Sequence, residues 1–180
     1  MWWVVGLVVA AALLSAYLGW TAHRVERVHA RAASAERALD AHLLRRAAAA
    51  AVVAEHFDVA ELYAAARLAL DAEPGEREAA ENDLTRRLQA VPLAGTDAAT
   101  HTLIVTSRRV VLARQVHTDL VRDALTARRR PLVRVLGMAR RYPRPHYFDI
   151  VEPALLDLPA RPVPAQGVAP AEPAVPVEAA

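Results

Sequence analysis

The sequence predicts an all-α protein: an N-terminal transmembrane helix that runs into an antiparallel bundle of three to four long helices, followed by a disordered C-terminal tail. Residues 2–20 are an uncharged apolar run. Apolar residues between 21 and 130 recur at spacings of three and four, the period of one helix face. No β-pattern of any length is present. We therefore expect an anchor at 2–20, a helical bundle at 21–139, a docking segment at 140–158 and a Pro/Ala-rich tail at 159–180.

Residues 2–20 have the length and composition of a membrane span. At about 1.5 Å per residue, a helix of this length just crosses a hydrocarbon core of roughly 30 Å. Trp2 and Trp3 stand at one end and Trp20 at the other, where aromatic rings favour the membrane–water interface. A signal peptide would begin with Lys or Arg, be shorter and end on small residues, so we expect a retained anchor.

The flanks of this run predict its orientation. No Arg or Lys precedes it, whereas Arg24, Arg27, Arg31 and Arg37 follow it closely. Basic residues are in excess on cytoplasmic flanks. The N-terminus is therefore expected outside and the bulk of the chain in the cytoplasm.

Composition excludes several classes of function. The chain has 180 residues, a net charge of +2 and no cysteine. It therefore has no disulfide framework, thiol nucleophile or thiolate metal site, and its net charge gives no argument for nucleic acid.

Four helices are expected after the anchor. The first continues the anchor to Phe57 without Pro or Gly. Asp58 and Glu61 read as a capping box that starts the second. Pro74-Gly75 interrupts it and opens a third, which ends before the Pro92–Thr96 loop. The predicted stripe of the first helix consists of Val25, Val28, Ala32, Ala35, Leu39, Leu43, Ala47, Ala50, Val53 and Phe57.

The fourth helix is expected from about Asp97 to Arg130, stopped by Pro131, with a short helix over 131–139. Tyr147, Phe148 and Ile150 could then pin the C-terminal segment onto the bundle. The stripe of the fourth helix is predicted to be Ala99, Leu103, Thr106, Val110, Ala113, His117, Leu120, Ala124 and Ala127.

Two arrangements of these helices stay open. If residues 59–91 form one return rod with a jog at Pro74-Gly75, the last helix runs away from the membrane. If Pro74-Gly75 reverses the chain, the last helix returns to the membrane. We prefer the three-rod arrangement, because its rods have matched lengths.

Four stretches resemble the LemA family of bacterial proteins: residues 35–49 (AERALDAHLLRRAAA), 77–91 (REAAENDLTRRLQAV), 108–121 (RRVVLARQVHTDLV) and the closing YFD at 147–149. The Tyr-Asn pair of the family's third motif is His117-Thr118 here. The resemblance implies an antiparallel helical bundle at a membrane and no established biochemical activity.

No pattern for catalysis or a cofactor is found. A di-metal helical bundle needs two Glu-x-x-His pairs, and Glu26 with His29 is one alone. His42 and His117 lie on or beside an apolar stripe, where a histidine is expected to serve packing. No nucleophile elbow, phosphate loop or HExxH is present. We therefore expect no enzymatic activity and no cofactor.

One charge feature is unusual. Residues 124–148 contain seven arginines and no acidic residue. A solvated helix end, where arginine is favourable, is one explanation. The alternative is a site for an anionic partner, with lipid ranked above nucleic acid because the stacking aromatic repeat is missing. This candidate interaction patch, called the arginine cluster below, consists of Arg128, Arg129, Arg130, Arg134, Arg140, Arg141 and Arg144.

The expected function is that of a single-pass protein of the plasma (inner) membrane. Residues 2–20 would contact the bilayer, and the bundle would be a non-enzymatic scaffold for a protein partner whose identity the sequence leaves open. The alternative is a peripheral binder of anionic lipid or nucleic acid that works through the arginine cluster.

Overall fold

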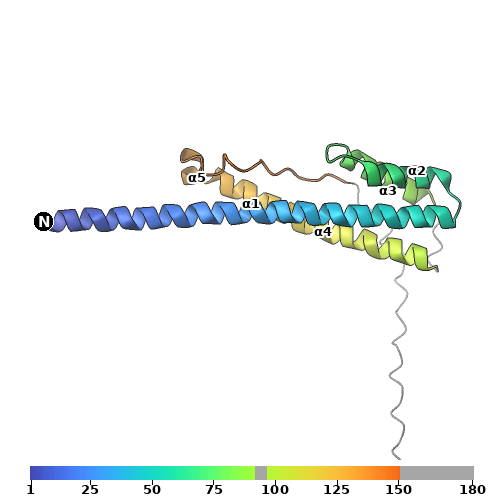
Figure 1. The fold of residues 1–180 in the computed structure, drawn as a ribbon, viewed down its shortest axis with the longest axis horizontal. Helices are drawn as coiled ribbons and strands as arrows, with labels where there is room; N and C mark the ends of the chain where they lie inside the picture. The colour runs from blue at the N-terminus through green and yellow to red at the C-terminus, as the bar shows by residue number, and fades with distance from the viewer. Residues whose placement is uncertain (92–96, 151–180) are drawn as a thin grey trace, which may run out of the picture.

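The computed structural model describes residues 1–91 and 97–150, and this part of the chain is all-α. Its helices are α1 (Trp2–His56), α2 (Ala60–Asp71), α3 (Arg77–Ala90), α4 (Ala98–Arg129) and the short α5 (Pro131–Val135) (Figure 1). The predicted Pro92–Thr96 loop, the end of the docking segment and the 159–180 tail lie outside the described residues.

Helix α1 confirms that the apolar N-terminal run continues into the bundle without a break. Its 55 residues correspond to about 80 Å. The helix is long and apolar enough near its N-terminus to cross a membrane. Over residues 1–20 every side chain is exposed except Leu18, which is half-buried, and burial begins at Thr21. The first third of α1 therefore projects from the bundle as a single helix (Figure 1).

The start of α2 differs from the prediction. The helix begins at Ala60 with Val59 as its N-cap residue, and no side chain caps it. Asp58 has a φ of +53°, a left-handed conformation that a non-glycine residue adopts in a turn. The expected capping box is wrong because Asp58 is used to turn the chain at the end of α1, before α2 begins.

Pro74-Gly75 reverses the chain, so our preferred three-rod arrangement is wrong. Arg87 on α3 is ion-paired with Glu61 at the start of α2, and Arg77 donates to the carbonyl of Ala69 at its end (3.4 Å). These pairs make α2 and α3 an antiparallel hairpin. The matched lengths of the rods did not decide the arrangement of the helices. The two short helices α2 and α3 instead pack side by side on the same distal half of α1.

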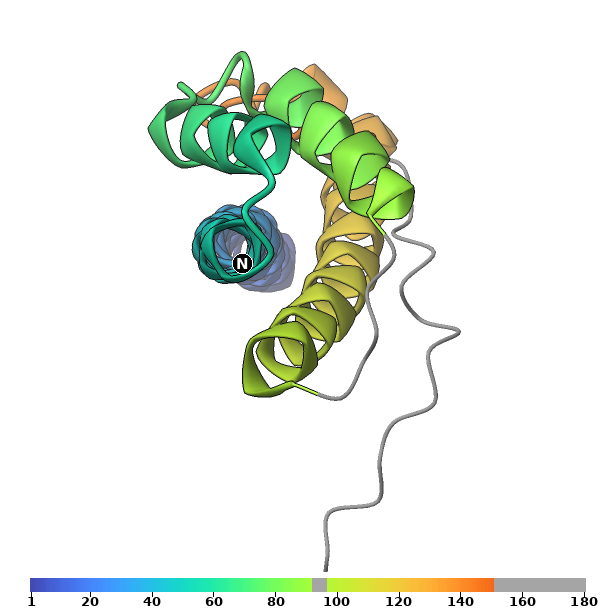
Figure 2. The ribbon, with the colours of Figure 1, turned by 90° about the vertical axis from the view of Figure 1, so that its right-hand side faces the viewer.

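Helix α4 consequently runs antiparallel to α1 and back toward the N-terminal segment. Leu103 belongs to the same core as Ala47 to Ala54, and Val110 packs with Leu39 and Leu43. Figure 2 shows α1 nearly end-on, with α2, α3 and α4 around one side of it. Asp97 caps α4 by accepting from the Thr100 N–H at 2.8 Å.

Most of the predicted stripes are buried. In α1, Val25, Ala32, Leu39, Leu43, Ala47, Ala50 and Val53 are buried, while Val28 and Ala35 are half-buried and Phe57 is exposed. In α4, Leu103, Val110, His117, Ala124 and Ala127 are buried, while Ala99, Thr106, Ala113 and Leu120 are half-buried. Because many of these side chains are small, helices α1 and α4 can approach closely along their seam.

The C-terminal segment docks as predicted through two of its three apolar residues. Ile150 is buried and Phe148 packs beside it, against Leu39, Leu43 and Val110. Tyr147 is exposed instead. The predicted short helix begins at Pro131 but ends at Val135 rather than at residue 139, because the chain turns at Gly137.

Candidate functional site

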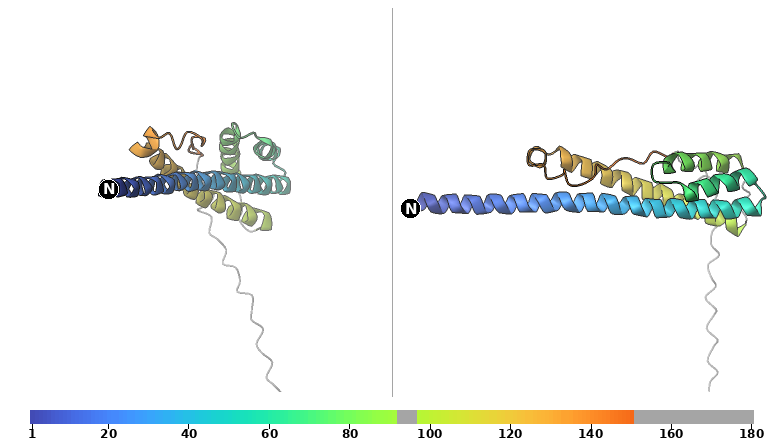
Figure 3. Two further views of the ribbon diagram at one scale, coloured as in Figure 1. Left: turned by 60° about the vertical axis from the view of Figure 1, so that its left-hand side comes forward. Right: turned by 45° about the horizontal axis from the view of Figure 1, so that its top comes forward.

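The arginine cluster lies at the end of the bundle that adjoins the apolar N-terminal segment. Val25 on α1 packs with Val133 on α5 and with Ala139, and Met138 and Tyr142 complete this contact. In Figures 1 and 3, α5 lies beside α1 at the base of the projecting segment. The antiparallel course of α4 therefore brings residues 128–144 back to the start of the bundle.

Arg128 is the one half-buried member of the arginine cluster. Its Nη1 donates to the carbonyl of Tyr142 at 3.1 Å and lies 3.2 Å from Nε2 of His29. His29 is buried, and its Nδ1 lies 2.8 Å from the carbonyl of Val25. A carbonyl only accepts, so Nδ1 carries the proton and Nε2 accepts from Arg128. Both nitrogens of His29 thereby have partners within the bundle.

Arg141 is held by two neighbours. Its guanidinium lies 5.0 Å from the ring centre of Tyr142, and its Nη2 lies 4.0 Å from the Glu26 carboxylate. The other face of Tyr142 is not open either, because the ring stacks on His29 at 4.9 Å. Arg141 is nevertheless exposed, as are the remaining members of the arginine cluster: Arg129, Arg130, Arg134, Arg140 and Arg144.

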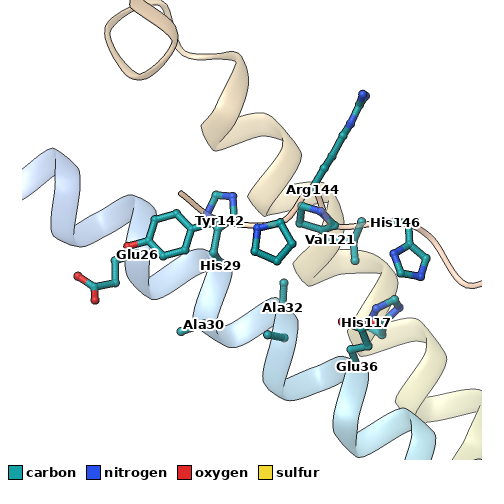
Figure 4. A pocket seen from close by; sticks show the side chains of 13 residues that line it. Glu26, His29, Ala30, Ala32, Glu36, His117, Val121, Tyr142, Arg144 and His146 are labelled. Atoms are coloured by element: carbon teal, nitrogen blue, oxygen red, sulfur yellow. The ribbon is translucent and has the colours of Figure 1, made fainter. Parts of the chain in front are cut away.

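A groove of about 390 Å³ lies between α1, α4 and residues 142–146 (Figure 4). Its floor contains the small residues Ala30, Ala32 and Ala33, and residues 142–146 cross it as a strap. Titratable side chains gather toward one end: Glu36, His117 and His146. Glu26 and His29 line the other end. His117 and the Glu26–His29 pair, which the sequence analysis considered separately, therefore share one groove.

His117 is the deepest polar side chain of this groove. It is 3% exposed, and its Nδ1 has no hydrogen-bond partner among the described residues. Burial lowers the pKa of His117, with His146 acting in the same direction and Glu36 opposing it. His117 is therefore neutral at pH 7. His42 stands apart, half-buried, with its Nδ1 3.5 Å from Arg45.

The sequence reasoning missed a buried ionic cluster at the other end of the bundle. Arg46 and Glu81 are both fully buried and face each other across α1 and α3 at 3.3 Å. Nearby, Nε of Arg77 lies 2.9 Å from the carboxylate of Asp40. The sequence did contain an indication of this cluster, because Arg46 lies between Leu43 and Ala50 on the buried face of α1.

The four stretches singled out in the sequence analysis contact one another. Asp40 and Arg46 belong to the first stretch and Arg77 and Glu81 to the second. Val110 of the third packs on Leu39 and Leu43. The backbone of Asp149, in the fourth, exchanges hydrogen bonds with Glu78 and Asn82. These stretches thus hold the helices together, and Glu36, His117 and Val121 among them also line the groove.

Comparison with known proteins adds no relative: no family model, no curated protein and no solved structure matches the chain.

Proposed function

We propose that the chain is a single-pass protein of the plasma (inner) membrane and a LemA-like, non-enzymatic scaffold. Residues 2–20 would span the bilayer with the N-terminus outside, and the bundle would bind a partner protein in the cytoplasm. The observation that carries this proposal is the exposed apolar first third of α1, which continues as one helix into the bundle. An apolar surface of this size needs a nonpolar environment.

A second apolar surface supports the binding of a partner. Leu112 and Val116 on α4 are 61% and 56% exposed. They flank a shallow groove of about 300 Å³ whose other lining includes Ala35, Ala38 and Ala113. His42 and Arg109 also line this groove. Large aliphatic side chains beside small ones offer a place for apolar side chains of another protein.

Site-specific photo-crosslinking in the full-length protein tests this function. A photoreactive residue at Val116 should give discrete crosslinked products that contain a protein partner, and Leu112→Ser should diminish them. The same residue at Gln89, which is exposed on α3, serves as the control. Equal crosslinking at 116 and 89 would show that this surface is not a docking site.

Binding of anionic lipid is the second candidate function. Its support is the place of the arginine cluster beside the base of the projecting helix. Nucleic acid is less well supported, because the ring of Tyr142 is held between His29 and Arg141 and is not free to stack on a base.

A further inference from the structure

Helix α5 and the turn after it present apolar side chains to the outside. Val135 is 81% exposed and Leu136 is 49% exposed. The opposite face of the same turn packs on the bundle through Val133 and Met138. An exposed aliphatic pair is thus held on a segment whose inner face is fixed.

The turn has a defined geometry. Pro131 opens α5 at its first position, where its missing N–H costs nothing. At the other end, the N–H of Met138 donates to Val133 (3.1 Å) and that of Gly137 to Arg134 (3.3 Å). This pair of bonds, with Gly137 at a φ of +63°, is a Schellman motif. Val135 and Leu136 are therefore presented by a closed turn.

The turn lies level with the membrane edge that the anchor defines. Burial along α1 begins at Thr21, the residue after Trp20, and Val25 packs directly on Val133. Val25 follows Trp20 by five residue steps along the helix, a rise of about 7.5 Å. The headgroup layer on one side of a bilayer is about 5–8 Å deep. Figures 1 and 3 show α5 farther toward the N-terminus than the end of α4.

The charges around the turn complement an anionic surface. Arg130, Arg134 and Arg140 are exposed on either side of Val135 and Leu136. On α1, Arg24 and Arg27 are exposed at the same level. The acidic side chain of Glu26, on the same part of α1, is engaged by His23 (3.5 Å) and Arg141 (4.0 Å).

We propose that residues 130–140 form a second membrane contact, in which Val135 and Leu136 enter the headgroup boundary while Arg130, Arg134 and Arg140 bind the phosphates of anionic lipids. This inference rests on the proposed anchoring by residues 2–20. Basic residues beside an apolar pair are the composition that binds peripheral segments to anionic bilayers. Two attachments would also fix the rotation of α1 about its axis, so that the groove and the Leu112–Val116 surface keep one orientation above the membrane.

The experiment uses the full chain in nanodiscs that contain phosphatidylcholine with or without phosphatidylglycerol, and lipids that carry a quencher in their acyl chains. The chain has no cysteine, so a single Val135→Cys or Leu136→Cys can be labelled with a fluorophore without further changes. We expect strong quenching of either label in the anionic discs. A label at Leu68→Cys, exposed on the distal helix α2, should not be quenched. Arg130→Gln, Arg134→Gln and Arg140→Gln together should remove most of the quenching at 135.

The anchor is monitored separately in the same samples. All three tryptophans of the chain, Trp2, Trp3 and Trp20, lie in the apolar run, so quenching of tryptophan fluorescence reports its insertion. Quenched tryptophans with an unquenched label at 135 and 136 would overturn the second contact and leave the anchor intact. Unquenched tryptophans would overturn both. Quenching at 135 that is equal with and without phosphatidylglycerol would overturn the assigned role of the arginines.

Discussion

Arg46 on α1 and Glu81 on α3 form an ion pair in the interior of the bundle, with 3.3 Å between Nη2 and Oε2. Both side chains are fully buried. The same Nη2 donates to the hydroxyl of Thr85, which in turn donates to the carbonyl of Glu81 (2.8 Å). With the Arg77–Asp40 pair it links α3 to α1, whereas α2 packs on α1 through the apolar core.

Truncation of one partner should be costly. Arg46→Ala leaves Glu81 buried without its counter-charge, and we expect a loss of about 3–5 kcal/mol in the free energy of unfolding. The double variant Arg46→Met with Glu81→Leu removes both charges at similar volume and should recover most of this loss. Denaturation of the full-length protein in detergent, followed by circular dichroism, measures both. A double variant as unstable as Arg46→Ala would show that hydrogen bonds, and not charge pairing, dominate.

The pair should also make stability depend on pH. Burial raises the pKa of Glu81 to about 7, against the lowering effects of Arg46 and Arg77. A carboxyl with a higher pKa in the folded state binds its proton more tightly there. Its contribution to stability is therefore present below about 4.5, the ordinary value, and is lost as the pH rises through about 7.

Glu81→Gln isolates this effect, because every other titratable group of the chain is the same in both proteins. Between pH 5 and pH 8, the free energy of unfolding of the wild type should decrease relative to that of Glu81→Gln. A shift in favour of the wild type would mean that Arg46 keeps the carboxylate ionised.

Local periodicity predicted which segments are helical and most of the α1–α4 seam, because the spacing of apolar residues follows directly from helix geometry. It could not predict the direction of α4. That direction depends on whether Pro74-Gly75 bends or reverses the chain, and the pairs that settle it, Glu61 with Arg87 and Ala69 with Arg77, are tertiary.

The candidate site was predictable only as a list of residues. The run of arginines was visible in the sequence, but its members have different roles: Arg128 is bonded to His29 and the Tyr142 carbonyl, whereas Arg130 is exposed. Which arginine is enclosed depends on the path of residues 139–145 over α1. No pattern in the chain encodes that path.

A charge in the α1–α4 seam should be strongly destabilising. Ala124 is fully buried, so Ala124→Glu places an unpaired carboxylate in the core and should cost several kcal/mol. Ala113→Glu, at a position that also lies on the predicted stripe, should cost less because Ala113 is half-buried at the edge of a shallow groove. Ala48→Glu on the exposed side of α1 is the control. Thermal melts in detergent should rank the three variants in this order.

Gly137 should be required for the turn after α5. Its φ of +63° is unfavourable for any residue with a Cβ, and an added Cβ would come within 3.2 Å of the Arg140 side chain. Arg140 is flexible, so the backbone conformation is the main cost, about 1 kcal/mol for Gly137→Ala. Amide hydrogen exchange should then rise at Met138 and Val135 and remain unchanged in α2. Uniform protection across the variant would show that the turn tolerates alanine.

Two groups of arginines that lie close together in the fold should differ in their effect on membrane orientation. Basic residues direct insertion when they lie within about 15–20 residues of the span in sequence, so Arg24, Arg27 and Arg31 should set the topology. Arg130, Arg134 and Arg140 lie at the same level in the structure but more than a hundred residues after the end of the span at Trp20. In the wild type, a cytoplasm-active reporter fused after Ala180 should be active and a periplasm-active one silent. Changing the first group to Ser should produce a mixed or inverted population, whereas changing the second to Gln should leave the reporters unaltered. If the second group alone inverts the topology, the bundle folds before the span inserts.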